Sequence, residues 1–373
     1  MEPNALHALL GGVLGLTPGA VVMMAVGGLL IYLAVVKDYE PMLLLPIGAG
    51  AILANLPLSP LVAPDGLLSI LYDVGVGNEL FPLLIFIGIG AMTDFGPLLE
   101  NPRLMLLGAA GQFGIFGTLM LALALGFTLN QAASIGIIGA IDGPTSIYVS
   151  GRLAPELLGP ITVCAYSYMS LVPVIQPPIM RWLTTRRERT IRMPYTRRAI
   201  SKRTRVLFPL IVTLVVGTLV PMATPLIGML MLGNLMKESG VVERLTGASS
   251  KEIANVVTLF LGLAVGSTMR ADAFLTVSTL KILGLGVLAF GLDTAAGLAF
   301  AKLINLASGG TFNPLLGAAG ISAFPMAARV VNRVGLEEDY ENFLLMHAMG
   351  ANTAGQVASV VAGGVLLALL GAS

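Results

Sequence analysis

One carboxylate stands inside an otherwise uncharged apolar stretch of the chain, residues 136–148. A charged side chain at membrane depth costs at least roughly 2.5 to 3.5 kcal/mol on insertion scales, so we expect Asp142 to line a cavity rather than to face lipid. Gly143 and Pro144 interrupt a helix here, and proline suits the first turn of a new helix. Broken helices of this kind bind ions near the bilayer midplane through unwound carbonyls and helix ends. The alternative is that Asp142 caps an ordinary helix in a loop between two spans.

A second interrupted stretch carries polar groups with one strong base, namely Asn313, Gly317, Ser322 and Arg329. Asn313 precedes Pro314 and is expected to cap a short helix. Gly317 lies four residues after Asn313 and shares its helix face. An amide and a hydroxyl would give neutral oxygens to a small hard cation, and Asp142 would give the charge. The alternative is that the small residues only pack helices and Asn313 only caps.

A third stretch places polar side chains inside an apolar segment near the end of the sequence. Asn352 and Gln356 are four residues apart and share a helix face. Polar residues often only link membrane helices, so this signal is weak by itself. His347 follows the charged stretch 337–341, and we interpret it as a helix-end residue rather than a proton relay.

A pair of tyrosines occupies a segment that begins as a helix and ends against prolines, residues 166–178. Tyr166 and Tyr168 point to different faces of this helix, so one can be interior while the other packs against a neighbour. An interior tyrosine can donate a proton. The alternative is a structural tyrosine in the aromatic belt at the membrane interface.

The composition places these groups in a membrane protein. The chain is 56% hydrophobic and 11% charged, whereas soluble domains carry about 25% charged residues. We therefore expect an all-α polytopic membrane protein with roughly nine to eleven membrane segments, given the ~20 residues that one span needs. The 45 glycines and 22 prolines predict kinked or re-entrant segments, two of which are the breaks at Asp142 and Asn313. The apolar runs are residues 20–36, 41–56, 104–125, 161–183, 206–220, 254–266 and 356–370.

The sequence excludes a metal cluster built from soft ligands. Its only cysteine is Cys164, and its only histidines are His7 and His347. These residues can form neither an intrachain disulfide nor a zinc cluster. Any metal ion is therefore expected to be held by oxygen atoms.

A net charge of +1 conceals one strongly basic segment. Positive loops that flank membrane spans stay in the cytoplasm, so this segment is expected to fix the topology. It can also bind anionic lipid headgroups or dock an acidic partner subunit. Nucleic-acid binding is the weakest interpretation, because the segment contains no recognition module. Only Glu188 opposes its ten basic residues, which are Arg181, Arg186, Arg187, Arg189, Arg192, Arg197, Arg198, Lys202, Arg203 and Arg205.

The two halves of the chain resemble each other faintly. Pro82 precedes Gly90 by the same spacing with which Pro225 precedes Gly233, and each half then runs through a long apolar segment to its break. Internal repeats of this kind are typical of secondary transporters, whose substrate site lies between the repeats, so we expect an inverted repeat. Membrane sequences are degenerate enough for the match to arise by chance. The expected division is a first membrane half (1–180), a basic cytoplasmic loop (181–205) and a second membrane half (206–373).

Four motifs resemble those of the membrane-embedded beta subunit of the biotin-dependent, sodium-pumping decarboxylases, the oxaloacetate, methylmalonyl-CoA and glutaconyl-CoA decarboxylase family. The resemblance extends over nearly the whole chain from about Phe81 onward, whereas the region before Tyr39 is shorter than in the longer family members. The motifs are Gly-Ala-Ile-Asp-Gly-Pro-Thr around Asp142, Tyr-Ser-Tyr-Met-Ser-Leu-Val-Pro around Tyr168, Asn-Pro-Leu-Leu-Gly-Ala-Ala-Gly-Ile-Ser-Ala-Phe-Pro around Asn313, and His-Ala-Met-Gly-Ala-Asn-Thr-Ala-Gly-Gln around Asn352.

The resemblance implies an enzyme subunit that decarboxylates carboxybiotin and couples this reaction to sodium export with consumption of a proton. It implies catalytic roles for Asp142, Tyr168 and Arg329, with Arg329 also binding carboxybiotin. Composition and spacing alone favour only an ion-coupled transporter, so a stand-alone sodium-coupled carboxylate symporter is the alternative. The implied sodium ligands are Asp142, Asn313, Gly317, Ser322 and Asn352.

The resemblance also implies partners and a location. The chain has no biotin-accepting Ala-Met-Lys-Met segment, so the biotin is expected on another subunit. The implied partners are a carboxyltransferase subunit, that biotin carrier subunit and a small membrane anchor subunit, together with membrane lipid and without nucleic acid. The implied location of this multi-pass chain is the cytoplasmic (inner) membrane of a prokaryote, in an oligomeric complex.

Overall fold

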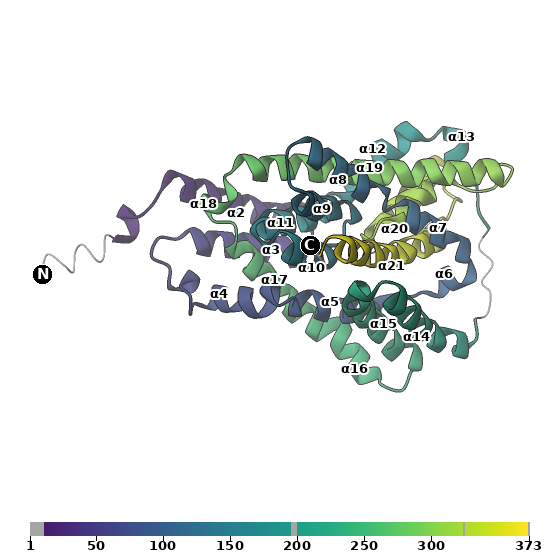
Figure 1. Cartoon of the computed structure of the whole chain (residues 1–373). Helices are drawn as coiled ribbons and strands as arrows, with labels where there is room; N and C mark the ends of the chain where they lie inside the picture. Colours follow the sequence, from purple (N-terminus) through teal and green to yellow (C-terminus); the bar gives the residue numbers. More distant parts are fainter. Residues whose placement is uncertain (1–10, 195–199, 324, 372–373) are drawn as a thin grey trace, which may run out of the picture.

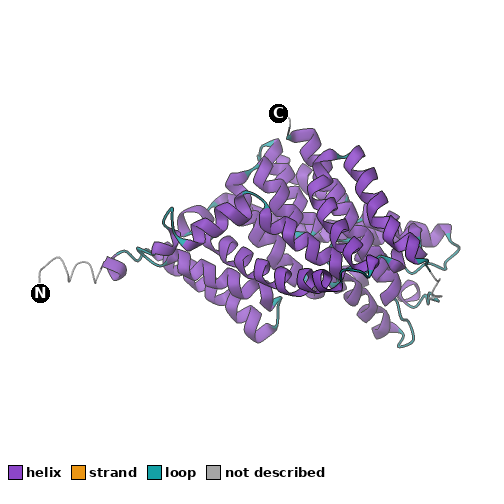
Figure 2. Cartoon of the chain, turned by 90° about the horizontal axis from the view of Figure 1, so that it is seen from below, coloured by secondary structure: helices purple, strands orange, loops and turns teal. Residues whose placement is uncertain are grey.

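The computed structural model describes residues 11–194, 200–323 and 325–371. Helices supply the regular structure of these residues, and no strand occurs in them (Figure 2). The expected all-α fold is therefore confirmed. Proline and glycine divide the first part of the chain into short helices: α2 (Pro18–Lys37), α3 (Pro41–Asn55), η1 (Pro60–Val62), α4 (Leu67–Leu71), η2 (Tyr72–Gly77), α5 (Leu80–Met92), α6 (Gly96–Glu100), η3 (Pro102–Leu104), α7 (Met105–Ala110), α8 (Phe113–Ala124), α9 (Leu129–Gly136), η4 (Ile137–Ala140), α10 (Gly143–Leu153), η5 (Pro155–Leu157), α11 (Leu158–Ser170) and α12 (Val172–Leu183).

The second part of the chain contains the two longest helices, α19 and α21, neither of which has a proline in its interior. Without proline, every backbone amide in the helix interior can donate along the helix, so these two helices run uninterrupted. The helices of this part are α13 (Arg186–Arg189), α14 (Lys202–Leu219), η6 (Pro221–Ala223), α15 (Thr224–Ser239), α16 (Glu243–Ala248), η7 (Ser249–Ile253), α17 (Ala254–Ser267), α18 (Ala271–Phe274), α19 (Val277–Ala307), η8 (Pro314–Gly320), α20 (Met326–Glu338) and α21 (Leu345–Leu370).

The helices form one elongated bundle, with α9 and α10 near its middle (Figure 1). Helices α2, α3 and α18 lie at the end nearest the N-terminus, and α14, α15 and α16 lie along one edge. Helix α21 packs against both α10 and α20 at the centre. The two helices that follow the breaks are therefore held by the same C-terminal helix.

Fewer helices are long enough to cross a membrane than the sequence predicts. Among the described residues, five helical stretches are long and apolar enough, or up to seven if two bent helix pairs each form one span. One such pair is α3 with the segment Pro60–Gly77, bent by 103°. The expected count of nine to eleven is not confirmed, because apolar segments such as α5 (13 residues) form helices shorter than a span.

Helices α5 and α15, which carry the two faintly similar segments, pack against each other. A Cβ at Gly90 would overlap the Leu230 carbonyl oxygen, and a Cβ at Gly233 would overlap the Ile87 carbonyl oxygen. Each glycine thus faces the residue three positions before the other, so the contact is reciprocal. Glycine lets the two backbones approach this closely. The inverted orientation of the halves, and their bounds, stay predictions.

The basic loop is fixed to the end of α20 by ion pairs. Arg189 pairs with Glu338 at 2.7 Å, and both side chains are mostly buried. The Arg192 guanidinium hydrogen-bonds to Asp339 and holds the pKa of that carboxyl below its usual value. The acidic segment 337–341 therefore neutralises positive charges of the basic loop, which contains only one acidic residue of its own, Glu188. Three predicted residues, His7, Arg197 and Arg198, lie outside the described residues.

We predict that Gly233→Ala destabilises the protein by about 1 to 3 kcal/mol, because the added methyl group must push α15 away from α5. Thermal unfolding of the purified protein in detergent measures the effect. Gly228→Ala is the matched control, since it lies on the same helix and a Cβ there would meet no atom within 4 Å. Equal melting temperatures for the two variants would contradict this account of the α5–α15 contact.

Candidate functional site

The first break lies between α9 and α10, as predicted. Helix α9 tightens into the 3₁₀ helix η4, Ile141 takes a left-handed conformation with φ of 52°, and α10 begins at Gly143. The Asp142 carboxylate accepts a hydrogen bond from the Thr145 backbone N–H (3.2 Å) and so caps α10. Asp142 is only 5% exposed. It is thus both a helix cap and a carboxylate buried inside the bundle.

The second break begins at Asn313, whose side-chain oxygen caps η8 by accepting from the Leu315 N–H (3.0 Å). The backbone becomes extended at Ile321, after the end of η8. The Ser322 backbone N–H then donates to the Ala140 carbonyl oxygen (3.2 Å), which belongs to the first break. The two interrupted segments therefore meet, and each satisfies a backbone group that the other leaves without a helical partner.

The Asp142 carboxylate is surrounded by hydroxyl groups from three parts of the chain. Its Oδ2 accepts from Thr145 Oγ1 (2.6 Å), Ser359 Oγ (2.7 Å) and Ser322 Oγ (3.4 Å). Ser359 and Ser322 also lie within hydrogen-bonding distance of each other (3.2 Å). We call these four residues the Asp142 cluster. One carboxylate with several neutral oxygens is the ligand set that small hard cations prefer.

Helix α21 presents the polar side chains of Asn352 and Ser359 to the breaks and that of Gln356 to the end of α5. The Asn352 side-chain N–H donates to the Ile321 carbonyl oxygen (2.7 Å), and its Oδ1 is buried without a hydrogen-bond partner among the described residues. Gln356 Oε1 accepts from Thr93 Oγ1 (3.3 Å). Ser359 is not among the residues predicted from the sequence, although it lies seven residues after Asn352 and so on the same helix face. That spacing was the signal that could have identified it.

A cavity of about 440 Å³ adjoins the Asp142 cluster. Asp142, Ser322 and Gln356 line it together with Arg329, which is exposed, and Glu40. Burial raises the pKa of Glu40, and the Arg329 charge opposes this shift. The volume of the cavity is within the range of small-molecule sites. Its apolar wall comes from α5 and α11, with Ile85, Phe86, Ile89 and Met169.

The structure separates the two tyrosines, as expected for residues on different helix faces. Tyr166 lines the cavity, and its ring occupies the space where a Cβ on Gly143 would lie. Tyr168 points toward α19 instead, where its hydroxyl donates to the Leu283 carbonyl oxygen (2.6 Å). The tyrosine beside Asp142 is therefore Tyr166, whereas Tyr168 is not brought to the Asp142 cluster.

Two predicted sodium ligands also lie away from Asp142. The Asn313 side-chain N–H donates to the backbone carbonyls of Arg189 (3.1 Å) and Ile191 (2.8 Å), so it ties the second break to the basic loop. Gly317 packs against Gly297 of α19, where a Cβ on either would overlap the other's carbonyl. Both residues thus fix η8 in place, and of the predicted ligands only Ser322 contacts Asp142.

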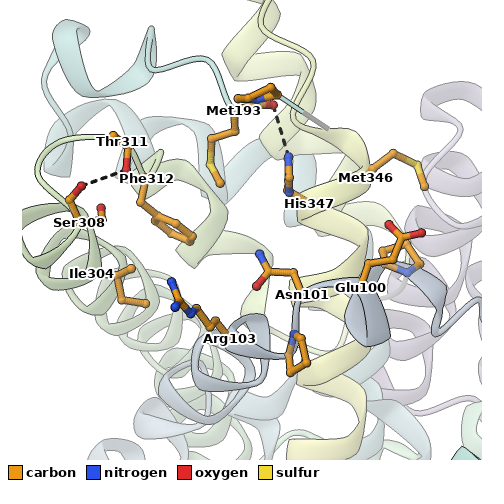
Figure 3. Close-up of a pocket in the computed structure, with 13 residues that line it drawn as sticks. Glu100, Asn101, Arg103, Met193, Ile304, Ser308, Thr311, Phe312, Met346 and His347 are labelled. Atoms are coloured by element: carbon orange, nitrogen blue, oxygen red, sulfur yellow. Dashed lines mark hydrogen bonds between the residues drawn. The ribbon is translucent and has the colours of Figure 1, made fainter. Parts of the chain in front are cut away.

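A second cavity, of about 610 Å³, lies where the basic loop meets the start of α21 (Figure 3). Arg103 and Asn101 face it from η3 and the residue before it, and His347 faces it from α21. The His347 ring nitrogen Nε2 is 3.3 Å from the Met193 carbonyl oxygen. This position agrees with the helix-end interpretation of His347. The residues that line this cavity include none of the predicted sodium ligands.

Comparisons with known proteins agree with the motifs. A family model described as the Na⁺-transporting oxaloacetate decarboxylase beta subunit matches residues 19–370. The oxaloacetate decarboxylase beta chain 2 of Salmonella typhimurium and the oxaloacetate decarboxylase beta chain of Klebsiella pneumoniae are each 50% identical to this chain, with 98% of each chain covered. The methylmalonyl-CoA decarboxylase subunit beta of Propionigenium modestum is 51% identical over 96% of this chain and 97% of that one.

These matches extend over nearly the full chain, and both break motifs lie within them. The relatives are named beta chains or beta subunits, so this chain is one part of a multi-subunit complex. The chain belongs to the family of sodium-transporting oxaloacetate decarboxylase beta subunits, the membrane subunits of sodium-translocating decarboxylases.

Proposed function

We propose that this chain decarboxylates carboxybiotin and couples that reaction to sodium export with consumption of a proton. The observation that carries the proposal is the Asp142 cluster, which lies where the two breaks meet and adjoins the cavity that contains Arg329. The family match favours this function over a stand-alone carboxylate symporter. Sodium is then the transported ion, and biotin carries the carboxyl group that is lost.

Sodium binds at the Asp142 cluster in this proposal. The carboxylate gives the negative charge, and the hydroxyls of Thr145, Ser322 and Ser359 give neutral oxygens. The hydroxyl hydrogens must turn away from Asp142 to admit the ion, which needs rotation of each hydroxyl and no backbone movement. Asn352 Oδ1, buried and without a hydrogen-bond partner among the described residues, is the further oxygen near the second break.

In this proposal, Asn313 and Gly317 hold the sodium ligands in position and do not bind the ion themselves. Asn313 caps η8 and holds the basic loop, and Gly317 allows η8 to approach α19 closely. Both contacts determine where the extended segment that carries Ser322 lies. Substitution of either residue would therefore move a sodium ligand without removing one.

Arg329 binds the carboxylate of the substrate. Its guanidinium is exposed at the cavity, and no salt bridge joins it to another of the described residues, so it is available for a charge-assisted pair. The apolar wall of the cavity fits the hydrocarbon part of a biotin ring. Biotin supplies a carboxyl group that leaves as carbon dioxide once the ring accepts a proton. Arg329 and Glu40 orient that end of the substrate by their opposite charges.

A proton couples the two events. Exporting one sodium ion against 100 mV costs ~2.3 kcal/mol, so the reaction must not proceed without the ion. Sodium and a proton compete for the Asp142 carboxylate, since each neutralises its charge. Release of sodium thus lets Asp142 take up the proton that the reaction consumes. The resemblance gives the proton-donor role to Tyr168, and this role stays a prediction. Tyr166, in contrast, is the tyrosine that lines the cavity.

The basic loop indicates how the complex is arranged. Met92 lines the cavity, and its carbonyl oxygen accepts a hydrogen bond from Lys237. Glu238, the residue after Lys237, pairs with Arg205 of the basic loop. The cavity is therefore on the side of the basic loop, which the positive-inside rule places in the cytoplasm. A biotin carrier subunit would reach Arg329 from that side, with a carboxyltransferase subunit and a small membrane anchor subunit completing a complex in the inner membrane of a prokaryote.

We predict that Ser359→Ala weakens sodium binding by about 10- to 100-fold, because a hydrogen-bonding partner of a charged group contributes about 1.5 to 3 kcal/mol. Asp142→Asn should abolish binding at this site, since it removes the charge. Equilibrium binding of radioactive sodium to the purified chain measures both effects. Ser150→Ala is the control, because Ser150 is also buried but donates to the Ser146 carbonyl (2.6 Å). Unchanged affinity in Ser359→Ala would rule out its role as a ligand.

We predict that Arg329→Gln raises the KM for free carboxybiotin by about 10- to 100-fold, because it removes a charge-assisted pair. Steady-state decarboxylation by the purified chain at saturating sodium gives this value. Arg333→Gln is the matched control, since it lies one turn further along α20 and does not line the cavity. If both variants raise KM equally, Arg329 acts only through the general positive charge of the surface.

A further inference from the structure

A second carboxylate lies deep in the bundle, outside the Asp142 cluster. Asp293 is near the middle of α19, a helix long and apolar enough to cross a membrane, and it is fully buried. Its Oδ1 accepts a hydrogen bond from the Gly114 backbone N–H. Its Oδ2 has no hydrogen-bond partner, and no salt bridge reaches Asp293 from any of the described residues. The carboxyl group is therefore only half satisfied by the protein.

The surroundings of Asp293 join it to the first break. Gly114 is the second residue of α8, and Gly139 belongs to η4, three residues before Asp142. A Cβ on Gly139 would lie 2.8 Å from Asp293 Oδ2, so the oxygen that lacks a partner faces the η4 backbone. Any larger residue at Gly114 or Gly139 would displace the carboxyl group. Both glycines thus leave room for a carboxyl group at this point.

Helices α8 and α9 carry two further buried oxygens that lack hydrogen-bond partners among the described residues. Thr118 lies one turn after Gly114 on the same face of α8, and Ser134 lies on α9, which packs against α8. The hydroxyl oxygens of Thr118 and Ser134 are buried and have no hydrogen-bond partner among the described residues. Serine and threonine hydroxyls inside a helix usually donate to a backbone carbonyl one turn earlier. These two oxygens remain available to a ligand.

An ionised carboxylate with one donor is costly to bury, because a single hydrogen bond does not replace its hydration. Either a proton or a metal cation must neutralise it. We propose that Asp293 is a second cation-exchange site, which holds a proton in one state and a sodium ion in the other. The Asp293 O–H bond breaks when sodium enters, the proton leaves to water, and the carboxylate binds the ion, with Thr118, one turn after Gly114 on α8, offering a further oxygen.

This site rests on the proposed function for its role, since a second exchangeable ion beside η4 would be transported with the ion at Asp142. The two sites are distinct in structure. The Asp142 carboxylate is hydrogen-bonded by Thr145, Ser322 and Ser359, whereas Asp293 is bonded by Gly114 alone among the described residues. Helix η4 connects them, so movement at one break changes both.

The test uses the full purified chain with Asp142→Asn, which removes the first carboxylate. Infrared difference spectra are recorded between sodium chloride and choline chloride at equal ionic strength. We expect sodium to reduce the stretching band of a protonated carboxyl group and to raise the carboxylate bands. The double variant with Asp293→Asn should lose this change and one bound sodium ion per chain, while its amide oxygen still accepts from Gly114 and preserves the fold. Elution in gel filtration and thermal unfolding check that the fold is kept.

A spectrum of Asp142→Asn that does not respond to sodium would overturn the proposal and make Asp293 only a protonated cap of α8. Failure of the proposed function looks different. In that case wild type and Asp142→Asn bind the same amount of sodium, and only the Asp293→Asn change removes binding. Loss of one ion with each substitution supports both sites.

Discussion

The structure depends on the meeting of two interrupted helices around one buried charge. The Ser322 N–H donates to the Ala140 carbonyl, and this bond lies beside the Asp142 carboxylate. Unwound backbone inside a membrane is stable only where its polar groups find partners in the protein or line a cavity. Each break here supplies a hydrogen-bond partner for the backbone of the other, and the side-chain oxygens beside them form the Asp142 cluster. An ion at this point therefore bears on both halves of the chain at once.

Close helix contacts hold the two breaks in this position. Gly317 lets η8 lie against α19, and Gly355 of α21 faces the Gly320 carbonyl. Asn352 then binds the carbonyls of the extended segment, so α21 fixes the second break on one side while Ser359 reaches the first break. Packing between small residues in this way leaves little freedom for one segment to move alone. Binding at Asp142 is thus expected to be linked to the arrangement of α10, α20 and α21 together.

The features that could be predicted depend only on residues close together in the sequence. Gly143 and Pro144 are enough to interrupt a helix, and Asn313 before Pro314 is enough to cap one, so both breaks were located. The helical class followed from composition. The number of spans did not, because helix length is set by where proline and glycine end each segment and not by the length of the apolar run.

Contacts between distant segments could not be predicted in the same way. Nothing local shows that Glu338 will pair with Arg189, or that Tyr166 rather than Tyr168 will face Asp142, because both depend on how whole helices rotate against one another. Ser359 and Asp293 were missed for a related reason. Ser359 shares a face of α21 with Asn352, but only the folded structure shows that this face meets Asp142, and Asp293 stands in a long helix with no break next to it in the sequence.

The central claim is that sodium and the reaction share the site at Asp142. It is tested most directly by reconstituting the purified chain in lipid vesicles and measuring carbon dioxide release from free carboxybiotin together with transport of radioactive sodium. The account predicts that carbon dioxide release stops when sodium is removed, and that Asp142→Asn loses release and transport together. Continued decarboxylation in the complete absence of sodium, at the rate seen in its presence, would contradict it.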